Sequence, residues 1–239
     1  MVIVLFFDKK YFHFVKPLTT SINIHEPESK IHAHTFNLSN EQIKELKTYP
    51  NVVAVECDQM QFDPKKADTY YGGLNAKDPL RFQLTCRRGE YVLKSMSKFP
   101  NEYLFVITDT DTLMVNPLTE LKKEMKNYDI GIVRVSETKI CSGFFAARPT
   151  ERGKRYLRIF RDTAMAGRLF LCKDQKSLAK VYEKNKNDID FLMLSRKYLD
   201  HACNNDSYMW SGHKSRFGTK KEKHQRYLKK LESLKNEQN

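Results

Sequence analysis

The sequence predicts an α/β fold, in which helices flank a central, mostly parallel, Rossmann-like sheet within a single domain. Strand-like and helix-like patterns alternate along the first half of the chain, as a parallel sheet requires. The 239 residues suffice for one well-buried core but are too few for two full α/β domains, and no Ser/Gly-rich linker divides them. Near the middle, an apolar run at residues 103–108 ends abruptly in Asp109 and Asp111, as expected where a buried strand meets a ligand site.

Five segments support the parallel half of this sheet. Residues 2–7 are continuously apolar and predict a buried strand, whereas residues 17–24 carry apolar side chains four apart and predict a helix. Residues 31–36 alternate as in a second strand. Residues 39–42 (Ser-Asn-Glu-Gln) fit a capping box that begins another helix. The β-branched run at residues 52–55 predicts a third strand, which completes a strand-helix-strand-helix-strand succession.

The alternation continues after a long polar segment at residues 58–79, which predicts a functional loop. A helix is predicted over residues 85–99, before the strand that leads to the two aspartates. Asn116 and Pro117 predict an N-cap and a first helical residue, for a helix that continues through Lys126. The remaining predicted elements are strands at residues 130–135 and 143–147, helices at 151–164 and 174–183, an extended segment at 190–194 and a helical tail.

The net charge of +13 predicts anionic partners. Between residues 196 and 239 there are 11 Lys and Arg against 5 Asp and Glu, so this tail carries +6. Two interpretations remain open: a solvated lysine-rich helix, and a basic surface facing a diphosphate or an anionic polymer. The five cysteines contain no CxxC pair, which indicates neither a disulfide framework nor a cysteine-based zinc site. The apolar start is too short to span a bilayer and lacks a basic leader, so we expect a cytoplasmic protein.

Asp109 and Asp111 are the strongest indication of a site. Two carboxylates one residue apart at the end of a buried strand can hold Mg²⁺ or Mn²⁺ and leave positions for phosphate oxygens. The alternative is a polar turn in which both side chains cap the next segment. That alternative is weakened because Asn116 and Pro117 already predict the cap of the following helix.

The segment from Ile107 to Leu118 resembles the DxD segment of the GT-A-fold nucleotide-sugar glycosyltransferases, where an apolar strand runs into Asp-x-Asp and then into apolar residues. Four other segments resemble the same family in the same order. They are residues 80–88, which end in Arg87-Arg88, 141–160 with a glycine-containing strand and a helix, 173–178 with Asp174-Gln175, and 210–220, similar to a C-terminal His-Gly-Lys segment. The last departs from the compact H-x-x-G-x-x-K spacing. Altogether the resemblance covers residues 2–221.

The resemblance implies a role for each matching residue. It assigns donor binding to Arg87, Asp109, Gly143, Gln175, Lys214 and Lys220, metal binding to Asp109, Asp111 and His213, and a catalytic role to Asp174. Structural alternatives stand beside these roles: Arg87 and Arg88 could be ordinary helix-surface charges, Asp174 could cap its helix, and Gly143 could merely permit close packing. Arg87 is preferred to Arg88 because one of two adjacent residues should face away. The implied domain spans residues 1–221, followed by a basic helix or tail at residues 222–239.

The implied activity is transfer of a sugar from a nucleoside-diphosphate donor, expected to be a UDP-sugar, to a glycan, protein or lipid acceptor. A divalent ion on the aspartates would neutralise the leaving diphosphate, while Asp174 would take the acceptor proton or stabilise positive charge on the sugar.

Two other classes remain. The same segment, Asp109 to Thr112, also fits the D-x-D-x-T motif of haloacid-dehalogenase-type phosphatases, with Asp109 as nucleophile, although that motif usually lies early in the chain. A nucleic-acid-binding module is the weakest alternative, because lysines without an interleaved stacking platform are weak evidence for it, so we expect no specific nucleic acid partner. The tail could still contact a membrane surface peripherally.

Overall fold

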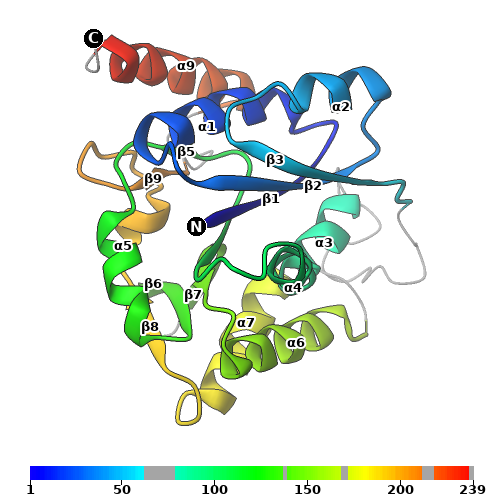
Figure 1. Ribbon diagram of the computed structural model, residues 1–239, viewed down its shortest axis with the longest axis vertical. Coiled ribbons are helices and arrows are strands. Elements are labelled where there is room, and N and C mark those ends of the chain that lie inside the picture. The colour runs from blue at the N-terminus through cyan, green and yellow to red at the C-terminus, as the bar shows by residue number, and fades with distance from the viewer. Residues whose placement is uncertain (62–78, 137–138, 168–171, 212–217, 237–239) are drawn as a thin grey trace.

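The computed structural model describes residues 1–61, 79–136, 139–167, 172–211 and 218–236, which form a large sheet with helices on both faces and a second, two-stranded sheet (Figure 1). The large sheet has the order β3-β2-β1-β4-β7-β6-β8. Its strands are β1 (Val2–Asp8), β2 (Lys30–Phe36), β3 (Val52–Asp58), β4 (Phe105–Thr108), β6 (Ile130–Ser136), β7 (Lys139–Ala147) and β8 (Phe191–Leu194). Among these strands only β7 pairs antiparallel with its neighbours. The predicted α/β fold with a mostly parallel sheet is therefore confirmed.

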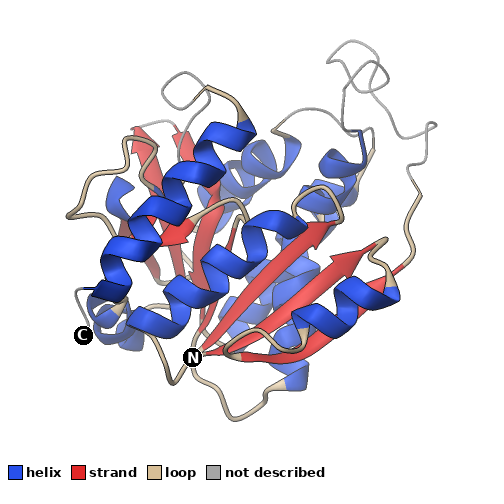
Figure 2. Ribbon diagram, turned by 90° about the horizontal axis from the view of Figure 1, so that it is seen from above, coloured by secondary structure: helices blue, strands red, loops and turns tan. Residues whose placement is uncertain are grey.

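Helices cover the sheet in two layers (Figure 2). The helices are α1 (Phe12–His25), α2 (Asn40–Leu46), α3 (Pro79–Cys86), α4 (Arg88–Lys98), α5 (Thr119–Glu124), α6 (Glu151–Met165), α7 (Lys173–Asn185) and α9 (Lys220–Asn236), with short 3-10 turns η2 (Met125–Asn127) and η3 (Arg196–Leu199). In Figure 1, α1, α2 and α9 lie above the sheet, whereas α3, α4, α6 and α7 lie below it.

Strand β1 shows why the central strands read as unbroken apolar runs. Successive side chains of a strand point to opposite faces, so a strand covered on both faces needs apolar residues at every position. Val2 and Val4 pack in the core that includes residues of α4, α6 and α7, whereas Ile3 and Leu5 pack in the core that includes residues of α1. All seven residues of β1 are buried.

Three predicted elements differ from the structure. The predicted helix at residues 85–99 is two helices, α3 and α4, separated at Arg87. Helix α5 begins at Thr119, so Asn116 is not its N-cap; the Asn116 amide instead donates to the carbonyls of Asn205 and Ser207, at 2.7 and 2.6 Å. Helix α1 begins at Phe12, five residues before the predicted start. The capping box at residues 39–42 is present as predicted.

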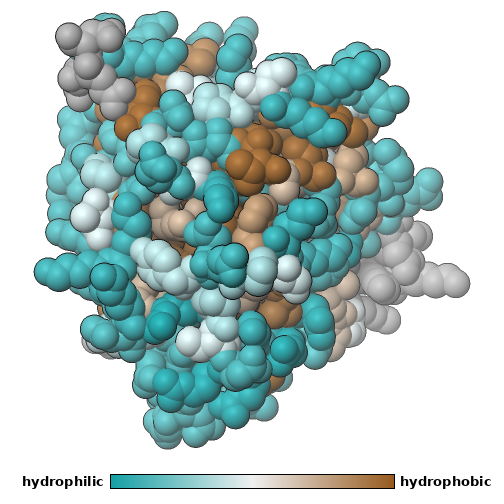
Figure 3. All heavy atoms as spheres, viewed as in Figure 1, coloured by the Kyte–Doolittle hydropathy of each residue, from teal (hydrophilic) through white to brown (hydrophobic). Residues whose placement is uncertain are grey.

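The strands β5 (Leu113–Met114) and β9 (Met209–Trp210) form the second sheet, directly after the acidic segment. Helix α9 then packs along α1, with Tyr227, Leu231 and Leu234 buried, so the predicted domain boundary at residues 221 and 222 falls inside a packed helix. No helix among the described residues is long and apolar enough to cross a membrane. Figure 3 shows a mostly hydrophilic face with a hydrophobic area over the edge strand β3, where Val53 is 54% exposed.

Candidate active site

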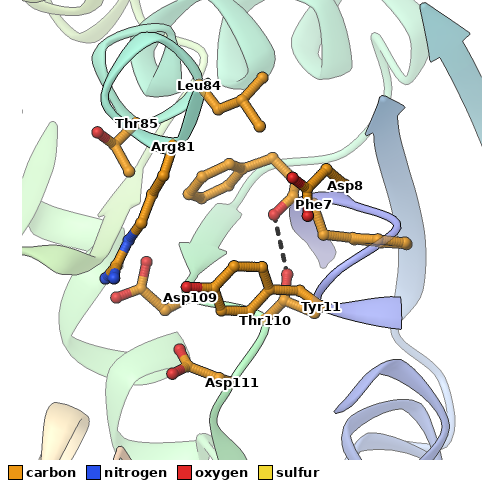
Figure 4. Close-up of a pocket in the computed structure, with 10 residues that line it drawn as sticks. Phe7, Asp8, Tyr11, Arg81, Leu84, Thr85, Asp109, Thr110 and Asp111 are labelled. Atoms are coloured by element: carbon orange, nitrogen blue, oxygen red, sulfur yellow. Dashed lines mark hydrogen bonds between the residues drawn. The ribbon is translucent and has the colours of Figure 1, made fainter. Parts of the chain in front are cut away.

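A pocket lies where β1 and β4 end, and the two aspartates form one of its walls (Figure 4). Because β1 and β4 are parallel neighbours, their carboxyl ends meet at the same edge of the sheet, where ligands bind in α/β folds. The pocket is lined by Phe6, Phe7, Asp8, Tyr11, Arg81, Leu84, Thr85, Asp109, Thr110 and Asp111. In Figure 4 the side chain of Arg81, from α3, points across the pocket toward Asp109. The pocket thus combines an aromatic wall with charges of both signs.

The turn after β4 is fixed by hydrogen bonds, and both of its aspartates line the pocket. The backbone N–H of Asp109 donates to the carbonyl of Gly143 at 2.9 Å, which ties the turn to β7. The hydroxyl of Thr110 donates to the carbonyl of Phe6 at 2.9 Å, and that of Thr112 donates to the carbonyl of Asp109 at 2.6 Å. The side chains between and after the aspartates therefore anchor the turn to β1 and to itself.

Arg88 joins Asp109 to Asp174. Its Nη2 lies 2.6 Å from Asp109 Oδ1, and its Nε lies 3.0 Å from Asp174 Oδ2, which also accepts a hydrogen bond from Ser142 Oγ at 2.7 Å. The guanidinium is 3% exposed and lies over the Phe6 ring, 4.5 Å from its centroid. Burial opposes the charged form, but Asp109 and Asp174 outweigh it and raise the pKa of Arg88. Its Nη1 is buried and has no hydrogen-bond partner among the described residues.

Arg88, and not the predicted Arg87, lies at the carboxylates. The helix break puts Arg87 at the N-cap of α4, where its guanidinium pairs with Glu90 at 2.5 and 2.7 Å. Arg88 is the first residue of α4 and points inward. Gly89 permits this placement, because a Cβ there would lie 2.7 Å from the carbonyl oxygen of Leu157 on α6. The close approach of α4 to α6 therefore decides which arginine is buried.

Asp111 pairs with Lys223 of α9. Lys223 Nζ lies 2.9 Å from Asp111 Oδ2 and 2.6 Å from the carbonyl oxygen of Ser211, and the Tyr227 hydroxyl donates to the backbone carbonyl of Asp111 at 3.1 Å. Burial by itself would raise the pKa of Asp111, but the ammonium of Lys223, followed by Arg81, holds it below its ordinary value. The second carboxylate of the motif is thus compensated by a cation from the C-terminal helix.

Several other predicted site residues have a defined place. Gly143 lies on β7 against Asp109, and a Cβ there would lie 2.8 Å from Asp109 Oδ2. Asp174 lies in the first turn of α7, but the N-cap is Cys172, so the carboxylate of Asp174 faces Arg88 and does not cap the helix. Gln175 follows it and is partly exposed.

Of the predicted basic site residues near the C-terminal end, Lys220 is described by the structure, whereas His213 and Lys214 are not. Lys220 begins α9, and its Nζ lies 3.8 Å from the centroid of the Tyr11 ring beside the pocket. His213 and Lys214 lie outside the described residues, so their predicted metal and donor contacts stay predictions.

Four residues of the site were not predicted from the sequence: Asp8, Tyr11, Arg81 and Lys223. Asp8 had a usable signal, since it ends an apolar strand in the same manner as Asp109, and a parallel neighbour of β4 must end beside it. Lys223 had none, because it is one of several lysines in a basic helix and meets Asp111 across 112 residues of sequence.

Similarity to known proteins is confined to structure. No family model and no curated protein sequence matches the chain. The apo form of the glycosyltransferase GlyE from Streptococcus pneumoniae TIGR4 superposes with a TM-score of 0.62 at 12% identity, over 99% of this chain and 62% of that chain. A second GlyE structure gives 0.61 at 10% identity with the same coverage. The chain therefore spans less than two thirds of GlyE and has the fold of that glycosyltransferase.

Proposed function

We propose that the chain is a GT-A-type glycosyltransferase, which moves a sugar from a nucleoside-diphosphate donor to an acceptor. The observation that carries this proposal is the chain of charges Asp109–Arg88–Asp174 beside the pocket at the ends of β1 and β4. It links the DxD motif to the carboxylate of the Asp-Gln motif across 65 residues of sequence, on a fold shared with GlyE. GlyE is named a glycosyltransferase, and its likeness supports the class of reaction.

The pocket chemistry suits a nucleotide donor. Tyr11 offers a flat aromatic face to a base or ribose, and Asp8 offers an acceptor for base or sugar hydrogen bonds. Arg81 and Lys220 bring positive charge to the same side of the acidic turn, as a diphosphate requires. Nη1 of Arg88, which has no hydrogen-bond partner among the described residues, would donate to a hydroxyl or phosphate oxygen of the bound donor.

The acidic pair fits a divalent cation. The contacts with Arg88 and Lys223 use Oδ1 of Asp109 and Oδ2 of Asp111, so each carboxylate keeps its other oxygen outside these contacts. Carboxylate oxygens are the ligands that Mg²⁺ and Mn²⁺ prefer. We therefore propose Asp109 and Asp111 as the metal ligands, joined by His213. A bound divalent ion would supply Lewis-acid stabilisation of the leaving diphosphate.

Asp174 is the carboxylate proposed to face the reacting sugar. The hydrogen bonds from Arg88 Nε and Ser142 Oγ both fall on its Oδ2. We propose that this carboxylate stabilises positive charge at the anomeric carbon, with Arg88 and Ser142 holding its orientation.

The proposal is tested by a donor screen with the purified chain. Nucleotide sugars, beginning with UDP-sugars, are added with Mn²⁺, and the melting temperature and the release of free nucleoside diphosphate are both measured. We expect one donor to raise the melting temperature and to be hydrolysed slowly. Asp111→Asn should abolish this response, while Asp206→Asn, which removes an exposed carboxylate paired with Lys197, should leave it intact.

The phosphatase alternative predicts the opposite pattern. A phosphatase with Asp109 as nucleophile would hydrolyse a generic phosphomonoester and lose that activity in Asp109→Asn. Cleavage of a phosphomonoester, together with no response to any nucleotide sugar, would refute glycosyl transfer.

A further inference from the structure

A histidine pair and a glutamate converge between β2 and β3, away from the acidic turn that follows β4. His32 and His34 lie two apart on β2 and so share a face, and the register places Glu56 of β3 directly beside His34. His32 Nε2 lies 3.2 Å from Glu56 Oε1, and His34 Nδ1 lies 3.2 Å from Glu56 Oε2. The imidazoles are 0% and 2% exposed, whereas the Glu56 side chain is 37% exposed. The three groups thus form a small polar cluster with one open side.

The hydroxyl of Ser95, on α4, fixes which ring nitrogens carry protons. Ser95 Oγ donates its single hydrogen to the carbonyl of Tyr91 at 2.8 Å. It must therefore accept from both rings, from His32 Nδ1 at 2.8 Å and from His34 Nε2 at 3.3 Å. In the neutral tautomers this leaves a lone pair on His32 Nε2 and on His34 Nδ1. Both lone pairs are on the atoms that lie beside Glu56.

The geometry at His32 agrees with such a lone pair. His32 Nε2 is buried and forms no hydrogen bond with any described residue, although Glu56 Oε1 lies 3.2 Å away. A buried ring nitrogen and a carboxylate oxygen therefore face each other without a hydrogen bond between them.

A bound cation would satisfy these groups. Buried acceptors without a donor are costly, and the nearest described ammonium, that of Lys94, stands 3.8 Å from Glu56 Oε2, beyond hydrogen-bond distance. Lys94 is 39% exposed and sits with Lys98 on the open side of the cluster. It compensates the charge of Glu56 from outside and does not reach between the rings.

We propose that His32 Nε2, His34 Nδ1 and the Glu56 carboxylate bind a divalent transition metal of the Zn²⁺ class, with water as the fourth ligand on the open side. Ligand atoms at about 2.0–2.1 Å from zinc in a tetrahedron lie about 3.3 Å apart, close to the two 3.2 Å separations present here. All three ligand atoms lie within 4.8 Å of one another, and among the described residues this is the one such group of His, Cys, Asp or Glu side chains.

Ser95 supplies the outer support that such sites use. Metal-bound histidines usually donate their second ring N–H to an oxygen, which fixes the tautomer and the ring orientation. Ser95 Oγ accepts from both rings at once, so a single hydroxyl holds both ligands. The metal would fasten the edge strand β3 to β2 beneath α4. Its role is independent of sugar transfer and of the acidic pair.

The test uses chain freed of purification tags and dialysed against a chelator. Co²⁺, the spectroscopic substitute for Zn²⁺, is titrated in millimolar Mg²⁺, which competes for the site at Asp109 and Asp111. We expect one equivalent of Co²⁺ to produce visible absorption bands, and one equivalent of Zn²⁺ to displace it and raise the melting temperature. Glu56→Gln should weaken binding about tenfold or more.

Two control variants keep the result specific. Glu90→Gln removes a neighbouring carboxylate that also pairs with Lys94, and His13→Gln disrupts another close histidine pair, with His224. Both should bind the metal as the unmodified chain does. X-ray absorption of the zinc-loaded chain, which needs no variant, should show two imidazole ligands. Absence of stoichiometric binding, an oxygen-only spectrum, or unchanged affinity in folded Glu56→Gln would each overturn the proposal and leave an ordinary buried histidine–glutamate contact.

Discussion

Replacing Arg88 with methionine should destabilise the protein far more than the same change at Arg87. Methionine keeps most of the volume of the arginine stem but removes its charge. In the folded state, Asp174 and Asp109 both lose the cation that compensates their charge. The side chain of Asp174 is 8% exposed, and that of Asp109 is more exposed. Arg87 forms its ion pair with Glu90 among the described residues, and these side chains are 18% and 22% exposed.

The magnitude follows from burial. Removing one partner of a buried ion pair costs about 3–5 kcal/mol, because the remaining charge stays desolvated. The Arg88–Asp174 contact falls in this class, whereas the contact with Asp109 is partly screened and adds less. A pair nearer the surface contributes about 1 kcal/mol or less, which sets the expectation for Arg87→Met. The two variants should therefore differ by at least about 2 kcal/mol in the free energy of unfolding.

Urea denaturation at neutral pH measures this difference. Trp210 is the only tryptophan, and its fluorescence reports the unfolding, with circular dichroism as the second probe. The double variant Arg88→Met/Asp174→Asn should lose less stability than the sum of the two single changes, since it has no Asp174 carboxylate left buried without its cation. Equal losses in Arg88→Met and Arg87→Met, or strict additivity in the double variant, would refute the charge linkage.

Two further changes test the acidic turn. Gly143→Ala places a Cβ 2.8 Å from Asp109 Oδ2, so it should lower the free energy of unfolding by about 1–3 kcal/mol and abolish the donor-induced rise in melting temperature. The control is Gly131→Ala on the adjacent strand, where the new Cβ meets the flexible side chain of Met125; this variant should keep that rise. Lys223→Met removes the ammonium that depresses the pKa of Asp111, so it should destabilise the protein at neutral pH. The stabilisation by this pair is complete above the pKa of Asp111 in the unfolded chain, about 3.9, and is lost as the pH falls through its lower pKa in the folded chain. The difference in urea midpoint between Lys223→Met and the unmodified chain should therefore narrow below about pH 4. A difference that stays constant with pH would contradict the pairing.

The fold was predictable from local patterns. Strand β1 is buried on both faces, so its sequence is an unbroken apolar run. The capping box at residues 39–42 predicts the start of α2 from four residues. The abrupt change from apolar residues to Asp109 and Asp111 marks the end of β4 for the same reason. Each of these patterns involves only residues that are neighbours in the sequence.

The partners within the site could not be predicted in this manner. The choice between Arg87 and Arg88 depends on one break between two helices and on how closely Gly89 lets α4 approach α6. Asn116 had the sequence signature of an N-cap, but its side-chain amide instead donates to two backbone carbonyls in a loop some 90 residues further along the chain. Long-range contacts decide these cases, and a local pattern contains no information about them.

The contact between Lys223 and Asp111 has a consequence for the order in which the protein matures during synthesis. Domains form from the N-terminus as the chain emerges, so β1, β2 and β4 can pair long before α9 exists. Until residue 223 appears, Asp111 has a carboxylate at the sheet edge without its ammonium partner, and Phe14 of α1 lacks the cover of Tyr227. Helix α9, which is made after these strands, therefore closes the site, and a nascent chain stalled before it would present an incomplete pocket.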